Sequence, residues 1–256
     1  MKKIILLSAF LVLCSPFLAF ASRNHHRYSP PPVNTPTTSF QVGFFQGPSG
    51  VPSSYSMSFT DGAFVGGSNQ VVFLEPPYND SGILAGKFDG TLKTFSQSAA
   101  KYQNVIIALG EEENCVGNNY DWSIGYDGNT VASSIQTIQH ESNIIRAYAP
   151  NVKIAQDLNA DNCNGTYPTA SYFASGVDLI GLDNFGSGES WSSLFQTAIN
   201  NLKGLKPIDI LSEGSSGNQT QFIQQTVAGA EQNGIQLVMY YNASPFNAPV
   251  STLSML

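Results

Sequence analysis

Eight short strand-like runs recur along this chain, and most of them are separated by segments with a helical pattern of apolar residues. Runs of β-branched, aromatic and aliphatic residues bounded by turn-forming residues predict buried strands. The runs lie at Phe40–Phe45, Tyr55–Thr60, Val71–Leu74, Val105–Leu109, Val152–Gln156, Asp178–Leu182, Pro207–Leu211 and Ile235–Tyr241. Strands that alternate with helices form parallel sheets, and this number of them predicts a closed (β/α)8 barrel, the TIM barrel. A doubly wound open sheet is the second architecture, although no Gly-rich dinucleotide motif follows any run.

The segments between the strands predict helices of unequal length. In the longest segment the apolar residues recur at three- and four-residue steps, as on one face of an amphipathic helix. The predicted helical segments are Gly90–Tyr102, Asn129–Ala149, Thr169–Ser175, Ser190–Leu202 and Gln219–Asn233. The first connection, residues 46–54, is rich in Gly, Pro and Ser and too short for an ordinary helix. We therefore expect a small barrel with an abbreviated first helix.

The first 39 residues have the composition of a targeting segment and a leader. Residues 1–21 begin with Met1-Lys2-Lys3, continue with an apolar stretch and close with Ala19-Phe20-Ala21, which predicts a secretory signal peptide cleaved after Ala21. Residues 22–39 are rich in Pro and Ser and predict a flexible leader. We expect residues 40–256 to form one domain that is secreted or periplasmic. No later apolar run is long enough to cross a bilayer, so we expect no membrane insertion.

Charge and composition exclude several classes of function. The net charge is −7, with 11 Lys and Arg residues in all, so a nucleic-acid-binding face is not expected. The single histidine after the leader, His140, lies inside a predicted helix, which excludes Ser-His-Asp hydrolysis and disfavours a zinc site. We expect no cofactor, a monomer, and a ligand that is polar and uncharged, such as a carbohydrate.

Two cysteines remain once a signal peptide is removed, and a secretory compartment permits them to pair. Cys115 and Cys163 each follow a predicted strand by a few residues. In a parallel barrel they would lie on neighbouring loops of one face. We therefore predict a disulfide between them; two free thiols are the alternative.

Acidic residues follow the predicted strands, and two of them suit glycoside hydrolysis. The run Val105–Leu109 ends before Glu111, Glu112 and Glu113, and the run Pro207–Leu211 ends before Glu213. The residues that close parallel strands meet at one rim of a barrel. Glycosidases need one protonated carboxyl and one carboxylate, about 5–5.5 Å apart in retaining enzymes. We predict Glu112 as acid/base and Glu213 as nucleophile. A solvated acidic loop is the alternative for the Glu111–Glu113 cluster.

The neighbours of Glu112 carry a prediction of their own. Like charges close together disfavour ionisation, so Glu111 and Glu113 are expected to raise the pKa of Glu112. A raised pKa would keep the general acid protonated.

These residues give the chain a resemblance to glycoside hydrolase family 26, a (β/α)8 family of retaining β-mannanases, β-glucanases and xylanases. The family's His-Glu-x-Asn motif after strand four aligns with Glu111–Asn114, which implies Glu112 as acid/base, and Lys206-Pro207-Ile208 resembles the segment that leads to its nucleophile, which implies Glu213. Further resemblances lie at Gly86–Asp89, Tyr120–Trp122, Gly128–Thr130, Ile145-Arg146, Asn151-Val152 and Val177–Asp183. The chain departs from the family where Glu111 replaces the histidine, Ala108 an arginine and Phe185 a tyrosine.

Aromatic and amide side chains near the strand ends predict how a sugar would be held. The chain's two tryptophans, Trp122 and Trp191, fall in predicted loops and are candidate stacking platforms. The other candidate substrate-binding residues are Asn114, Asp183, Phe185 and Tyr241. The sequence thus predicts a secreted endo-acting β-mannanase-like or β-glucanase-like hydrolase of a polysaccharide or oligosaccharide. The alternative is a non-catalytic or weakly active carbohydrate-binding protein on the same barrel, and retention of both glutamates argues against it.

Overall fold

The computed structural model of the protein describes residues 40–47 and 49–256. The predicted signal peptide and leader lie outside these residues. The eight strands form one closed barrel in which neighbouring strands, β1 and β8 included, run parallel. The strands are β1 (Gln41–Phe45), β2 (Tyr55–Thr60), β3 (Gln70–Leu74), β4 (Val105–Leu109), β5 (Lys153–Asn159), β6 (Leu179–Gly186), β7 (Ile208–Ser215) and β8 (Leu237–Tyr241). The predicted (β/α)8 barrel is confirmed.

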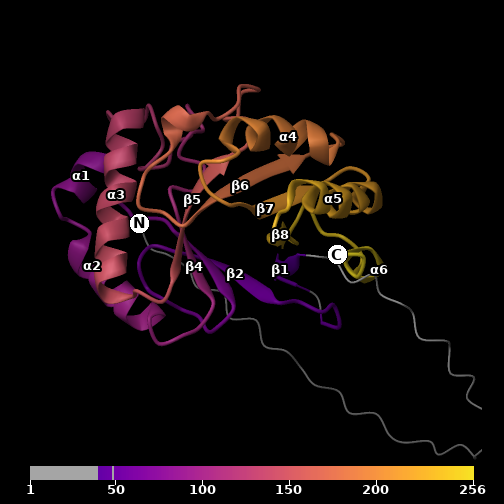
Figure 1. Ribbon diagram of the computed structural model, residues 1–256, viewed down its shortest axis with the longest axis horizontal. Helices are drawn as coiled ribbons and strands as arrows, with labels where there is room; N and C mark the ends of the chain where they lie inside the picture. The colour runs from indigo at the N-terminus through magenta and orange to yellow at the C-terminus, as the bar shows by residue number, and fades with distance from the viewer. Residues whose placement is uncertain (1–39, 48) are drawn as a thin grey trace, which may run out of the picture. The chain divides into compact units, whose positions relative to one another are not determined.

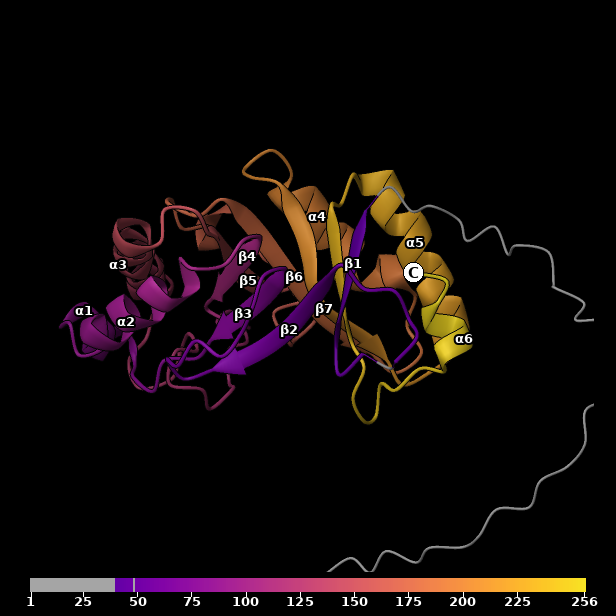
Figure 2. The ribbon, with the colours of Figure 1, turned by 90° about the horizontal axis from the view of Figure 1, so that it is seen from below.

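The helices cover the barrel in two groups, α1 to α3 on one side and α4 to α6 on the other (Figures 1 and 2). They are α1 (Asp80–Leu84), α2 (Asp89–Ala99), α3 (Val131–Tyr148), α4 (Trp191–Leu202), α5 (Gln219–Asn233) and α6 (Val250–Leu253). The helix predicted over Thr169–Ser175 is wrong, because only a single 3₁₀ turn, η1 (Ala170–Tyr172), forms there. In the described residues between β1 and β3 no helix occurs, as the abbreviated start predicted. None of the described helices is both long and apolar enough to span a bilayer.

The core consists of one layer inside the barrel and two layers under the helices. The inner layer includes Ile106, Ala155 and Leu211. On each strand the residues next to these inner ones face outward. Ile107 therefore packs under α1 to α3, and Ile210 packs under α4 and α5. This alternation follows from the two-residue period of a strand, and it decides which side chains reach the inside of the barrel.

Strand β7 carries one extra residue relative to its neighbour, and this reverses its alternation. Leu182 of β6 pairs with Ile210, but Asp183 pairs with Ser212, so Leu211 is the inserted residue of a β-bulge. Leu211 lies in the inner core layer and Ser212 lines the cavity at the barrel mouth. Because two successive residues face inward, every later residue of β7 points to the side opposite to the one that regular alternation predicts.

A disulfide joins Cys115 to Cys163 across a sequence separation of 48 residues, which confirms the predicted pair. It ties the loop after β4 to the loop after β5. In the chain-entropy model a crosslink of this span stabilises a fold by about 4 kcal/mol.

The bridge predicts the thiol chemistry of the folded protein. Cys115 and Cys163 should resist thiol reagents in the native state and react only after reduction. Mass spectrometry after alkylation, with and without reductant, measures this, and Cys115→Ser with Cys163→Ser should unfold at lower urea concentration. Stoichiometric labelling of the unreduced native protein would show that the bridge is missing.

Candidate active site at the barrel mouth

A cavity of about 570 Å³ opens at the carboxyl ends of the strands. This volume lies within the range of sites that hold small ligands. The cavity is lined by three carboxylic acids, six aromatic side chains and one serine: Phe59, Glu75, Glu111, Glu112, Tyr120, Trp122, Phe185, Ser212, Tyr241 and Phe246. The cavity therefore has the mixed acidic and aromatic character that the sequence predicted for this rim.

Glu112 lies at the cavity just beyond β4 and is held by an amide from β5. The side-chain amide of Asn159 donates to Glu112 Oε1 at 3.0 Å. The Asn159 Oδ1 atom accepts from the backbone N–H of Cys163 at 3.1 Å, so the disulfide loop positions this amide. The backbone of Glu112 is left-handed, with φ of 48°. Such a conformation is uncommon for a residue with a side chain and is kept here by the surrounding contacts.

Burial and one neighbouring acid raise the pKa of Glu112. Loss of water is the largest cause, the charge of Asp161 adds to it, and the hydrogen bond from Asn159 opposes it. The direction agrees with the sequence prediction, but the cause differs. Glu113, one of the predicted neighbours, points away from the cavity and accepts from Gln156 Nε2 at 2.6 Å and from the Ser134 hydroxyl. A carboxyl with a raised pKa suits a general acid.

Glu75 and Glu111 form a second acidic pair at the cavity. Their carboxyl groups share a hydrogen bond, and burial together with this bond raises the pKa of Glu111 to about 10. Two carboxyls that share a hydrogen bond must hold a proton between them. Among the described residues that line the cavity, none is Lys, Arg or His.

Aromatic rings form two walls around the acids. Tyr120 stacks on Trp122 with ring centroids 5.0 Å apart, and the Trp122 indole N–H donates to the Glu111 carbonyl at 2.7 Å. On the opposite side Phe185 contacts Tyr241 and Phe246, at 5.7 and 4.8 Å between centroids. Of the predicted substrate-binding residues, Trp122, Phe185 and Tyr241 therefore line the cavity.

Glu213 does not lie in the cavity, contrary to the prediction that it faces Glu112. Its side chain is wholly buried between β7 and the helices. Glu213 Oε2 accepts from the Trp191 indole N–H at 2.9 Å and Oε1 from the Thr226 hydroxyl at 2.8 Å. The bulge at Leu211 is the physical reason, because it turns Ser212 inward and Glu213 outward.

Three other predicted binding residues are buried rather than exposed to a ligand. Trp191 begins α4 instead of lying in a loop, and it packs closely against Gly229 of α5, where a Cβ atom would lie 2.1 Å from the indole ring. Asn114 pairs with the backbone of Asn159, through bonds of 2.7 and 2.8 Å. Asp183 is 1% exposed. The predicted direct contacts of these side chains with a sugar are not supported.

Several cavity residues had only a weak signal in the sequence. Glu75 directly follows the third strand and could be found from that position alone. Ser212 requires knowledge of the bulge. Phe246 follows β8 in a loop, and no sequence pattern assigned it to the mouth.

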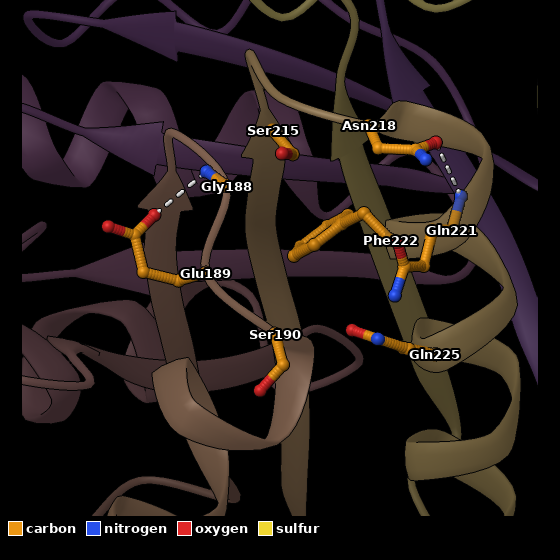
Figure 3. Close-up of a pocket in the computed structure, with 8 residues that line it drawn as sticks. All are labelled: Gly188, Glu189, Ser190, Ser215, Asn218, Gln221, Phe222 and Gln225. Carbon is orange, nitrogen blue, oxygen red and sulfur yellow. Dashed lines mark hydrogen bonds between the residues drawn. The ribbon is translucent and has the colours of Figure 1, made fainter.

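A second, smaller pocket lies beside β7 on its outer side (Figure 3). It measures about 70 Å³, which is too small for a sugar ring, and it lies between the Gly188–Ser190 segment and the first turns of α5. The Glu189 carboxylate already accepts from the Gly188 N–H at 3.0 Å. Separately, among the described residues the only group of three or more potential metal ligands is Glu112, Cys115 and Cys163, and its two sulfur atoms are bonded to each other.

Comparison with known proteins gives matches at the level of structure alone. No family profile and no curated protein sequence matches the chain. The glycoside hydrolase family 26 domain of an endo-β-mannanase/endo-β-glucanase from Prevotella bryantii superposes with a TM-score of 0.60 at 12% identity, over 85% of this chain and 88% of that domain. The protein has the fold of this family 26 domain.

Two further enzymes of the same family superpose on the chain. The family 26 endo-β-1,4-mannanase of Bacillus sp. JAMB-750 gives a TM-score of 0.57 at 14% identity, over 82% of this chain and 79% of that catalytic domain. The modular endo-β-1,4-mannanase of Cellulomonas fimi gives a TM-score of 0.57 at 12% identity, over 84% of this chain and 70% of that chain. The family 26 fold thus covers most of the chain, while the identities are too low to carry residue roles with it.

The buried acids of this fold predict a pH dependence of its stability. Burial is the largest cause that raises the pKa of Glu141 and of Glu213 to about 8, against an ordinary value of 4.5. The folded state therefore holds these protons more tightly than the unfolded state. The stabilisation that Glu141 and Glu213 contribute is fully present below about pH 4.5 and is lost as the pH rises through 8. Each group lowers the free energy of unfolding by up to about 1.4 kcal/mol per pH unit in that window.

Urea unfolding at a series of pH values measures this trend. Glu141→Gln removes a titrating group and should flatten the decline. Glu231→Gln, at an exposed position near the end of α5, is the matched control and should leave the curve unchanged. A wild-type stability that increases between pH 5 and 8 would contradict the raised pKa values.

Proposed function

We propose that the protein is a secreted glycoside hydrolase that cuts a polysaccharide within the cavity at the barrel mouth, in the manner of an endo-β-mannanase or endo-β-glucanase. The observation that carries the proposal is the position of Glu112, a carboxyl at the end of β4 in a cavity with aromatic walls. Pyranose rings have apolar faces that stack on aromatic side chains. Secretion belongs to the same proposal and rests on the predicted signal peptide and the disulfide.

Glu112 serves as the general acid in the proposed reaction. Burial and Asp161 raise its pKa, which keeps the proton that the leaving oxygen requires. The amide of Asn159 holds the carboxyl in one orientation. Tyr120 and Trp122 form a platform beside it on which a sugar ring can stack.

The second carboxyl of the reaction must come from a residue other than Glu213. Hydrogen bonds from Trp191 and Thr226 hold the Glu213 carboxyl on the outer side of β7, so the predicted double displacement through Glu213 is not retained. Besides Glu112, the carboxyls that line the cavity are Glu75 and Glu111. Glu111 has a pKa of about 10 and keeps its proton. We assign the second role to Glu75, and the anomeric form of the first product, measured by NMR, decides between retention and inversion.

A non-catalytic carbohydrate-binding protein is the second candidate. The same observation on Glu213 favours it, because β7 contributes Ser212 and no carboxyl to the cavity. Phe185, which lines the cavity beside β7, contributes a ring without a hydroxyl group.

Reducing-end release from mannan, xylan, lichenan and β-1,3-glucan tests the two candidates. Glu112→Gln and Glu75→Gln should each lower kcat by about 10²–10⁴-fold with the fold intact, because each removes a proton-transfer group or nucleophile. Glu213→Gln, matched in chemistry but outside the cavity, should keep kcat within about tenfold of the wild type.

Three outcomes would contradict parts of this assignment. Near-native turnover in Glu112→Gln would contradict the assignment of Glu112 as the general acid. A folded but inactive Glu213→Gln would favour Glu213 as the nucleophile, as the sequence predicted. Binding of a glycan without release of reducing ends at any pH would establish the binding protein instead.

A further inference from the structure

The acids of the mouth lie together, and within residues 40–47 and 49–256 no Lys, Arg or His lines the cavity beside them. The pKa of Glu111 is raised by burial and by Glu75, Asp157 and Glu112, and no cation acts on it. Elsewhere in the described residues, Arg146 pairs with Asp178, and His140 Nε2 lies 2.8 Å from Asp89 Oδ1. Both involve α3 side chains, which lie outside the cavity. The cavity therefore attracts positive charge and repels anionic ligands.

Two buried aspartates under the cavity have oxygen atoms that no described protein group satisfies. Asp157 of β5 and Asp183 of β6 are 0% and 1% exposed. Both oxygens of Asp157 and Oδ1 of Asp183 have no hydrogen-bond partner. Both side chains point into the barrel, because Asp157 lies two residues beyond Ala155 and Asp183 four residues beyond Leu179, and both of these belong to the inner core layer. Burial first and the charge of Glu112 second raise the pKa of both groups. Buried acceptors in proteins are normally satisfied. Neither aspartate lines the cavity, so a cation bound above them would act on these unpaired oxygens through its charge.

The walls add a second feature that favours a cation. The stacked Tyr120 and Trp122 and the opposite group of Phe185, Tyr241 and Phe246 present ring faces and edges around the acids. Aromatic faces attract ammonium groups, and several rings around one site are a known way to bind them. The same rings stack on the apolar face of a sugar.

We propose that the glycan bound in this cavity carries free amino groups, as in an oligomer of β-linked 2-amino-2-deoxyhexose. An ammonium group has three donors and no acceptor, which matches a site made of carboxyl oxygens. One such group donates to the acids Glu75, Glu111 and Glu112 while its ring stacks on Trp122. This inference rests on the proposed glycan-binding role of the cavity and names the substrate class.

Entry of a cation also moves protons. The titratable groups that line the cavity are Glu75, Glu111, Glu112, Tyr120 and Tyr241. Asp157, Asp161 and Asp183 act on them electrostatically from outside the lining. Each bound ammonium stabilises the ionised form of a neighbouring carboxyl, so binding should release a proton to the solvent. Neutral sugars have no such effect.

Isothermal titration calorimetry of the full chain tests the inference with three tetrasaccharides: the β-1,4-linked glucosamine tetramer, its N-acetylated form and mannotetraose. At a pH where the amines are protonated, the glucosamine tetramer should bind at least about tenfold more tightly than the other two. Titrations in two buffers of different ionisation enthalpy should reveal proton release for this ligand alone.

Variants locate the effect in the cavity. Glu111→Gln should bring the ratio of the affinities for the glucosamine tetramer and its N-acetylated form close to one. Glu75→Gln serves as a second variant if the first does not fold. Glu231→Gln makes the same substitution at a distant exposed position and should preserve the preference.

The outcomes separate this inference from the proposed hydrolysis. Equal or tighter binding of the N-acetylated tetramer or mannotetraose overturns the amino-sugar assignment, and the hydrolase proposal then stands or falls by the reducing-end assay. Tight, proton-releasing binding of the glucosamine tetramer without its cleavage supports the ligand and overturns hydrolysis. Absence of binding by all three overturns the inference.

Discussion

Closure of a fully parallel ladder is the constraint on which the rest of this protein depends. Because β8 pairs with β1 in the same direction as every other pair, all eight strands end at one rim. Residues from distant parts of the sequence, such as Glu75 and Glu112, are thereby brought to one cavity. The acids then share an environment with little water, to which the described part of the chain adds no cationic side chain, and this environment sets their protonation.

The barrel itself could be predicted from the sequence because it follows from simple repetition. The eight apolar runs lie where the strands form, and the helix predicted over Gln219–Asn233 has the observed bounds. The position of the Glu111–Asn114 segment at the barrel mouth could also be predicted, since Glu112 follows β4 by a few residues and lines the cavity. Local period and strand-end position carry this information without knowledge of long-range contacts.

The rest of the site depended on contacts that a linear pattern does not record. Regular alternation along β7 turns Glu213 inward, and only the pairing with β6 reveals that one residue is inserted. Trp191 is a residue type that often stacks on sugars. Gly229 of α5 has no side chain, and the indole ring packs into the space that this leaves, so Trp191 is buried. The helix expected at Thr169–Ser175 failed for a related reason. The side chain of Gln156 donates to the Tyr172 carbonyl and accepts from the Ala174 N–H, so these backbone groups bind β5 instead of continuing the single turn η1.

The bulge in β7 also bears on how such a site can change during descent. Past Leu211 the strand alternates regularly again, so loss of the bulge at unchanged length would shift the pairing with β6 by one residue and exchange the inward and outward sets. Ser212 and Glu213 would trade places without any substitution of either. A lineage can therefore gain or lose the β7 carboxyl of the mouth through changes that only decide whether the bulge forms, and pairwise identity hardly registers the event.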